Sequence, residues 1–173
     1  MTTTTLAHPV ARTLSVTAVG LLGALALPFV VHAIPYGGTV PLGAQLLPIF
    51  YVGVVLIARG QPLSALLVAA AAPWLNQQLT GMPAGPMLST LTLELLVFTL
   101  LLLALRRAWP LALPYAAPVA YLAASVAARW LLTGDAASLA RLGTTLEHAW
   151  PGLLLLLVIG IVATPRRARQ RAA

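Results

Sequence analysis

The chain has 173 residues, of which 60% are hydrophobic and only 8% are charged, so a soluble globule would lack the polar side chains that cover its surface. Its formal charge of +7 comes from ten arginines and no lysine, against three acids. The arginines lie between apolar runs and not on one solvated basic face, which argues against nucleic-acid binding. The absence of cysteine excludes disulfides, thiolate metal sites and cysteine nucleophiles. These features predict an all-α integral membrane protein.

Six apolar runs follow one another along the chain, and each is close to the ~20 residues that a helix needs to cross a bilayer. Proline and glycine separate them. We expect one membrane domain over residues 1–173, a compact bundle of six transmembrane helices. The first run lacks a small-residue cleavage site, so we expect a retained helix and not a signal peptide. The predicted spans are 13–31, 42–58, 62–79, 87–105, 111–132 and 146–164, followed by a basic tail at 165–173.

The distribution of arginine predicts the orientation of this bundle. Eight arginines fall on one side of the predicted spans, namely Arg12, Arg59, Arg106, Arg107 and the four of the tail, whereas Arg141 alone lies in the loops of the other side. Because positive residues accumulate in cytoplasmic loops, both termini are expected in the cytoplasm. The chain is therefore expected to be a multi-pass protein of the cell (cytoplasmic) membrane.

Polar side chains concentrate in the outer half of the predicted bundle. Glu94 is expected ~10 Å below the outer interface, and an ionisable group inside the membrane indicates a functional site by default. Arg129 lies about one turn from the outer end of its span. Helical spacing places further polar residues on the same faces as these two. The predicted substrate-binding residues are Glu94, Arg129, Gln77, Asn76, Trp74, Thr90, Tyr121, Ser125, Glu147 and His148.

Aromatic faces beside converging polar groups suit a small, partly polar organic molecule. The alternative interpretation is structural: Arg129 and Glu147 would form an interfacial ion pair, and the tryptophans would form an aromatic belt. The sequence carries no recognisable catalytic or nucleotide-binding motif. Glu147 and His148 are adjacent and point about 100° apart on a helix, a poor arrangement for a metal. We therefore expect no enzyme, no cofactor and no metal site.

A small-xxx-small ridge lies in the first span, at Gly20 and Ala24. Such ridges allow two helices to approach closely. We expect these two residues to contact a helix of a partner, and internal packing of the bundle is the alternative.

Three segments carry a family resemblance: Val-Pro-Leu-Gly-Ala-Gln-Leu-Leu-Pro at 40–48, Leu-Thr-Gly-Met-Pro at 79–83 and Leu-Glu-Leu at 93–95. With six short spans and cytoplasmic termini, they resemble the substrate-binding S components of energy-coupling factor (ECF) vitamin transporters, most closely the branch assigned to pantothenate and other vitamin-like substrates. The chain departs from that family in having Ala-Arg-Gly-Gln-Pro at 58–62 where many members have a Leu-Gly-Pro turn. Its first span also has Gly20-xxx-Ala24 in place of Ala-xxx-Ala.

The resemblance implies a high-affinity membrane binding subunit for uptake of a small vitamin-like molecule. It also implies partners, a transmembrane scaffold subunit and ATPase subunits, that supply energy. The alternative from another class is a small, non-enzymatic scaffold membrane protein of the cell-shape or cell-wall machinery, which needs no outer polar pocket.

Overall fold

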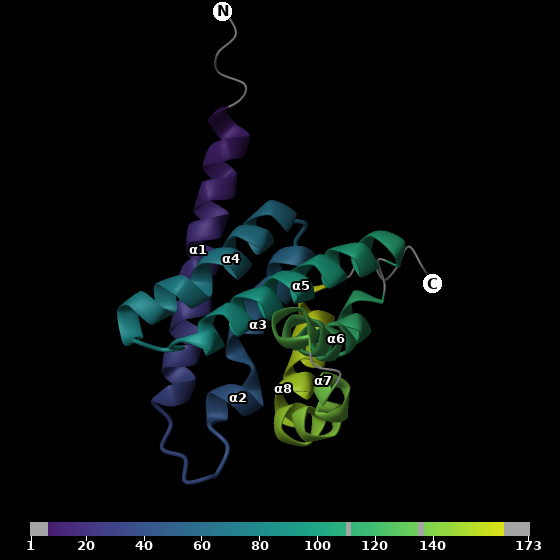
Figure 1. The fold of residues 1–173 in the computed structure, drawn as a ribbon. Coiled ribbons are helices and arrows are strands. Elements are labelled where there is room, and N and C mark those ends of the chain that lie inside the picture. Colours follow the sequence, from purple (N-terminus) through teal and green to yellow (C-terminus); the bar gives the residue numbers. More distant parts are fainter. Residues whose placement is uncertain (1–6, 110–111, 135–136, 165–173) are drawn as a thin grey trace, which may run out of the picture.

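A computed structural model describes residues 7–109, 112–134 and 137–164, and within these ranges it contains helices and no strand (Figure 1). This confirms the all-α prediction. Two helices are short, α2 (Leu42–Leu46) and α7 (Ala137–Ala140). The six longer helices of the described ranges are α1 (Ala7–His32), α3 (Pro48–Ala58), α4 (Pro62–Thr80), α5 (Pro86–Ala108), α6 (Leu113–Thr133) and α8 (Leu142–Ala163).

Four of the helices in these ranges are long and apolar enough to cross a membrane: Pro9–His32, Pro86–Ala108, Tyr115–Thr133 and Leu142–Ala163. The chain is thus a multi-pass membrane protein by length and composition of its helices. The other two predicted spans correspond to weaker candidates. Helix α4 has 19 residues but ends in a polar stretch, Asn-Gln-Gln-Leu-Thr, and the apolar segment Leu42–Ala58 is shorter.

The segment Leu42–Ala58 is also broken in the middle, between α2 and α3. Pro48 has no N–H to donate and disfavours the helical conformation of the residue before it. Leu47, which ends α2, adopts the left-handed conformation, with φ 54°, and its side chain is buried. The Tyr51 hydroxyl donates a hydrogen bond to the Leu46 carbonyl, which the break leaves without a helical partner. The predicted span 42–58 is therefore two helices joined by a sharp turn.

Helix α3 lies at the centre of the bundle and packs against α1, α4, α5 and α8. It is short but apolar all round, as expected of a buried helix, and Phe50, Val54 and Ile57 are almost completely buried. The Phe50 ring makes edge-to-face contacts with Phe98 of α5 at 5.2 Å and with Tyr121 of α6 at 5.0 Å between ring centroids. One aromatic side chain of α3 thereby joins three helices.

Two hydrogen bonds bring the arginine-bearing helix ends together. The Ser64 hydroxyl, in the first turn of α4, donates to the Thr13 carbonyl of α1 at 3.4 Å. The Arg106 guanidinium of α5 donates to the carbonyl of Ile57 in the last turn of α3, where helix carbonyls lack intrahelical partners. The same end of the bundle therefore carries Arg12, Arg59, Arg106 and Arg107.

Helix α8 touches the backbone of the α2–α3 segment at Gly152. A Cβ atom added there would lie 2.5 Å from the Gln45 carbonyl oxygen and 2.7 Å from Leu47 Cγ. Because the first of these atoms belongs to the backbone, it cannot move aside as a flexible side chain would. Gly152 is thus required for the contact between α8 and α2.

We predict that Gly152→Ala destabilises the protein by about 1–3 kcal/mol, the usual cost of overpacking a core. The measurement is the free energy of unfolding in detergent micelles. Gly143→Ala is the matched control in the same helix, since nothing lies within 4 Å of a Cβ there, and it should leave stability unchanged or raise it by up to ~1 kcal/mol. Equal effects of the two substitutions would show that α8 and α2 do not pack as described.

Candidate functional site

The structure brings Glu94 of α5 and Arg129 of α6 together across the interface between these two helices. Both side chains are partly buried, and the two charges interact electrostatically. Within the described part of the chain neither side chain forms a hydrogen bond or an ion pair, so the carboxylate oxygens and guanidinium nitrogens lie more than 4.0 Å apart.

Tyr121 is the third polar member of this group. It lies two helical turns before Arg129 on α6, is only 7% exposed, and interacts electrostatically with both Glu94 and Arg129. Its ring packs against Phe50, which in turn contacts Phe98, one turn after Glu94 on α5. We call these residues the Glu94 cluster: Phe50, Glu94, Phe98, Tyr121 and Arg129.

The chemistry of the Glu94 cluster is that of a mixed polar and aromatic site. A carboxylate accepts hydrogen bonds, a guanidinium offers five donors, and a phenol does both. Bonds to either charged group would be charge-assisted and correspondingly strong. The cluster therefore suits a small molecule that has a donor, an acceptor and an apolar or aromatic part.

Three other predicted ligand residues donate hydrogen bonds to backbone carbonyls close to them in the sequence. The Thr90 hydroxyl donates to the Pro86 carbonyl at 3.0 Å, and Ser125, which is 3% exposed, donates to the Leu122 carbonyl at 2.9 Å. Asn76 donates to the Met82 carbonyl at 3.0 Å and so holds the turn between α4 and α5. Local backbone acceptors compete with ligands for these side chains. The spacing of residues along a helix does not reveal that competition.

The remaining predicted residues are placed without polar partners in the described ranges. Trp74 is 49% exposed and Gln77 is partly buried on α4. Glu147 and His148 are exposed in α8. The interfacial ion pair between Arg129 and Glu147, which was the structural alternative, is not formed among the described residues.

Gly20 and Ala24 face the chain's own helices. Ala24 is completely buried, and a Cβ added at Gly20 would lie 2.9 Å from Val68 Cγ2 of α4 and 3.1 Å from Leu56 Cδ1 of α3. The close helix approach expected of a small-residue ridge is therefore found inside this chain. A contact of these residues with a partner helix is not needed to explain them.

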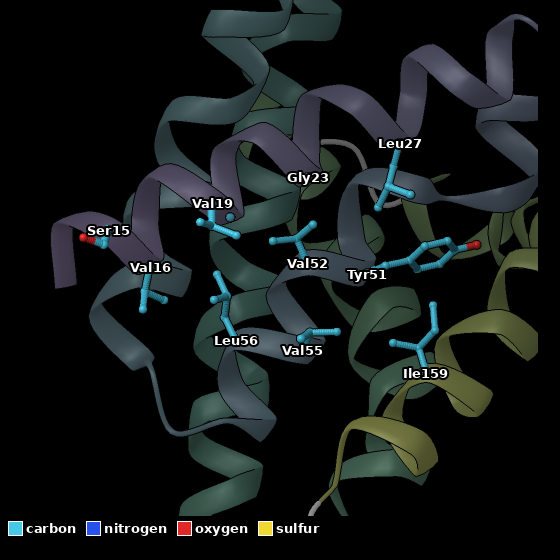
Figure 2. A pocket seen from close by; sticks show the side chains of 11 residues that line it. Ser15, Val16, Val19, Gly23, Leu27, Tyr51, Val52, Val55, Leu56 and Ile159 are labelled. Carbon is cyan, nitrogen blue, oxygen red and sulfur yellow. The ribbon is translucent and has the colours of Figure 1, made fainter. Parts of the chain in front are cut away.

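Two cavities lie away from the predicted ligand residues. One is a groove of about 530 Å³ between α1, α3 and α8, which Figure 2 shows from close by. The other is an internal void of about 10 Å³ between α3, α4 and α5, beside Thr99, whose buried hydroxyl has no hydrogen-bond partner. Sequence reasoning found neither, and it also missed Phe50, because these features depend on which helices become neighbours.

We predict that Glu94 and Arg129 are energetically coupled. In a double-mutant cycle with Glu94→Gln and Arg129→Gln, the effects on the free energy of unfolding should deviate from additivity by about 1 kcal/mol, within the range found for interacting charges. The control cycle pairs Glu94→Gln with Arg107→Gln, at the far end of α5, and should be additive within ~0.5 kcal/mol. Additivity in both cycles would show that Arg129 and Glu94 do not interact.

Comparison of the chain with known protein families, with curated protein sequences and with solved structures finds no match in any of the three.

Proposed function

We propose that this chain is the substrate-binding subunit of an uptake system in the cytoplasmic membrane. It would cross the membrane six times, with both termini in the cytoplasm, and bind a small vitamin-like molecule from outside. A transmembrane scaffold subunit and ATPase subunits would complete the system, as the resemblance to ECF S components implies.

The observation that carries this proposal is the geometry of the Glu94 cluster. Two opposite charges are held close in partly buried positions of apolar helices but are not joined. Burying charges without full pairing is costly, so an arrangement of this kind is retained more readily for a ligand than for stability alone. The aromatic contacts of Phe50, Phe98 and Tyr121 beside it would provide stacking area.

The proposed orientation rests on the arginines. Those of the described residues gather mainly at one end of the bundle, where Ser64 meets Thr13 and Arg106 meets Ile57. That end would be cytoplasmic by the positive-inside rule. Helix α4, with 19 residues and ~28 Å in length, and the α2–α3 segment would supply the two crossings beyond the four long apolar helices.

A scaffold membrane protein is the second candidate, and one observation favours it. The polar atoms of Thr90, Ser125 and Asn76 are already engaged by neighbouring carbonyls, as expected of residues that stabilise the bundle and do not bind a ligand. The two functions differ in what Glu94 does: it binds a molecule in the first and holds two helices together in the second.

We predict that Glu94→Gln weakens ligand affinity by roughly 10 to 150 fold, the effect of losing a charge-assisted hydrogen bond of about 1.5–3 kcal/mol. Small molecules that remain bound through purification in detergent would first be identified by mass spectrometry, and the identified compound would then be titrated against each variant. Arg107→Gln, which changes an exposed side chain at the far end of α5, serves as the control with wild-type affinity. Thermal unfolding of the same samples separates weaker binding from a damaged fold, and unchanged affinity of the Glu94→Gln protein would favour the scaffold.

The orientation makes a separate prediction. Gly37→Cys, in the α1–α2 loop where nothing lies within 4 Å of the added atom, should react with a membrane-impermeant maleimide in intact cells. Ala108→Cys, at the end of α5, should react only after the membrane is permeabilised. The chain has no native cysteine to give a background. The reverse pattern of labelling would invert the proposed orientation.

A further inference from the structure

The groove between α1, α3 and α8 is an apolar depression on the side of the bundle, separate from the Glu94 cluster. Helix α3 forms its floor and packs against both α1 and α8. Figure 2 shows Val16 and Leu56 near one end of the groove and Leu27 and Tyr51 near the other. Val19, Gly23, Val52 and Ile159 also line it.

The dimensions of the groove indicate what can occupy it. Along α1 it extends from Ser15 to Leu27, about 18 Å at 1.5 Å per residue. Its volume is about 530 Å³, and its lining residues are apolar apart from the hydroxyls of Ser15 and Tyr51. A flexible hydrocarbon chain, which has no polar group to desolvate, suits a groove of this length and lining.

The two helices that supply most of the lining, α1 and α3, each have an arginine just beyond the same end of the groove. Arg12 precedes Val16 by one turn on α1, and Arg59 follows Val55 and Leu56 by one turn at the end of α3, so each continues the face that lines the groove. Ser64, five residues after Arg59 in the first turn of α4, donates to the carbonyl of Thr13, the residue after Arg12, so α1 passes close to the segment that follows α3. Both side chains are exposed, and neither guanidinium has a partner among the residues that the structure describes.

We propose that this groove binds one acyl chain of an anionic phospholipid, whose phosphate lies between Arg12 and Arg59. Basic residues at the cytoplasmic ends of transmembrane helices attract anionic headgroups. An acyl chain that enters the groove comes from lipid and not from water, so it gains no hydrophobic free energy. The groove would therefore select lipids by the shape of the acyl chain, and the two guanidinium groups would select them by the charge of the headgroup. This site is independent of the ligand proposed for the Glu94 cluster.

Native mass spectrometry of the full chain in detergent micelles tests the proposal with dioleoyl phosphatidylglycerol and, as the neutral-headgroup comparison, dioleoyl phosphatidylcholine. We expect phosphatidylglycerol to bind about 25-fold more tightly, since each arginine contributes about a fivefold preference. Glycerol 1-phosphate, the soluble headgroup, should not compete at millimolar concentration if the acyl groove is required. Effective competition by it would reduce the site to a free phosphate site and overturn the proposal.

Two sets of variants separate charge from shape. Arg12→Gln with Arg59→Gln should reduce phosphatidylglycerol binding about 25-fold, to the level of phosphatidylcholine, whereas Arg107→Gln, an exposed arginine on another helix, should not. Gly23→Leu should block binding of both lipids, because a Cβ there meets only Val52 at an ordinary 3.5 Å and the longer side chain fills the groove. Ala18→Leu, an exposed position of α1 that does not line the groove, is its control.

The fold of each variant is checked by thermal unfolding. Val19→Phe provides a second blocking variant, since Val19 is 69% exposed and lines the groove. Equal binding of the two lipids, or unchanged phosphatidylglycerol binding in the folded blocking variants, would overturn the proposal. A wild-type dimer that Gly23→Leu converts to a monomer would also overturn it, because the groove would then hold a second copy of the chain.

Discussion

The edge-to-face contacts of Phe50 with Phe98 and Tyr121 are the interaction on which the rest of the described structure depends. They fix α5 and α6 against the central helix α3. In a bilayer, apolar side chains gain little by leaving lipid, so helices associate through shape and directed contacts. Rings that meet at 90° and 84° provide such a contact, since they define the rotation of each helix as well as its distance. Glu94 and Arg129 lie on the same two helices, so a rotation of either helix would change their separation.

Much of the fold could be predicted from the sequence because apolar length is a strong signal. The runs at 13–31, 87–105 and 146–164 each lie within an observed helix, apart from one residue at the last end. The break at Leu47 was missed, although Pro48 is its cause, because the apolar composition continues across it. Hydropathy reports how well a segment dissolves in lipid and not whether its backbone is continuous.

The candidate site was predicted less completely, for physical reasons that differ between residues. Glu94 and Arg129 interact electrostatically across the α5–α6 interface, and their role in binding a ligand stays a prediction. Ser125 has the right spacing but donates to its own helix, and Asn76 is used by the turn that follows α4. The small residues Gly20 and Ala24 do allow a close helix contact, yet a sequence cannot say whether the neighbouring helix belongs to the same chain. Partner identity, unlike depth, is a property of the assembled bundle.

Neighbouring residues of α3 face different parts of the molecule: Phe50 belongs to the Glu94 cluster, whereas Tyr51 and Val52 line the groove beside α1. A small rotation or shift of this one short helix would therefore change both the Glu94 cluster and the groove. If occupancy of the groove favours one position of α3, thermodynamic linkage requires that the cluster and the groove alter each other's affinity by the same factor. The composition of the surrounding membrane would then act as an effector of the protein, transmitted through a helix of 11 residues.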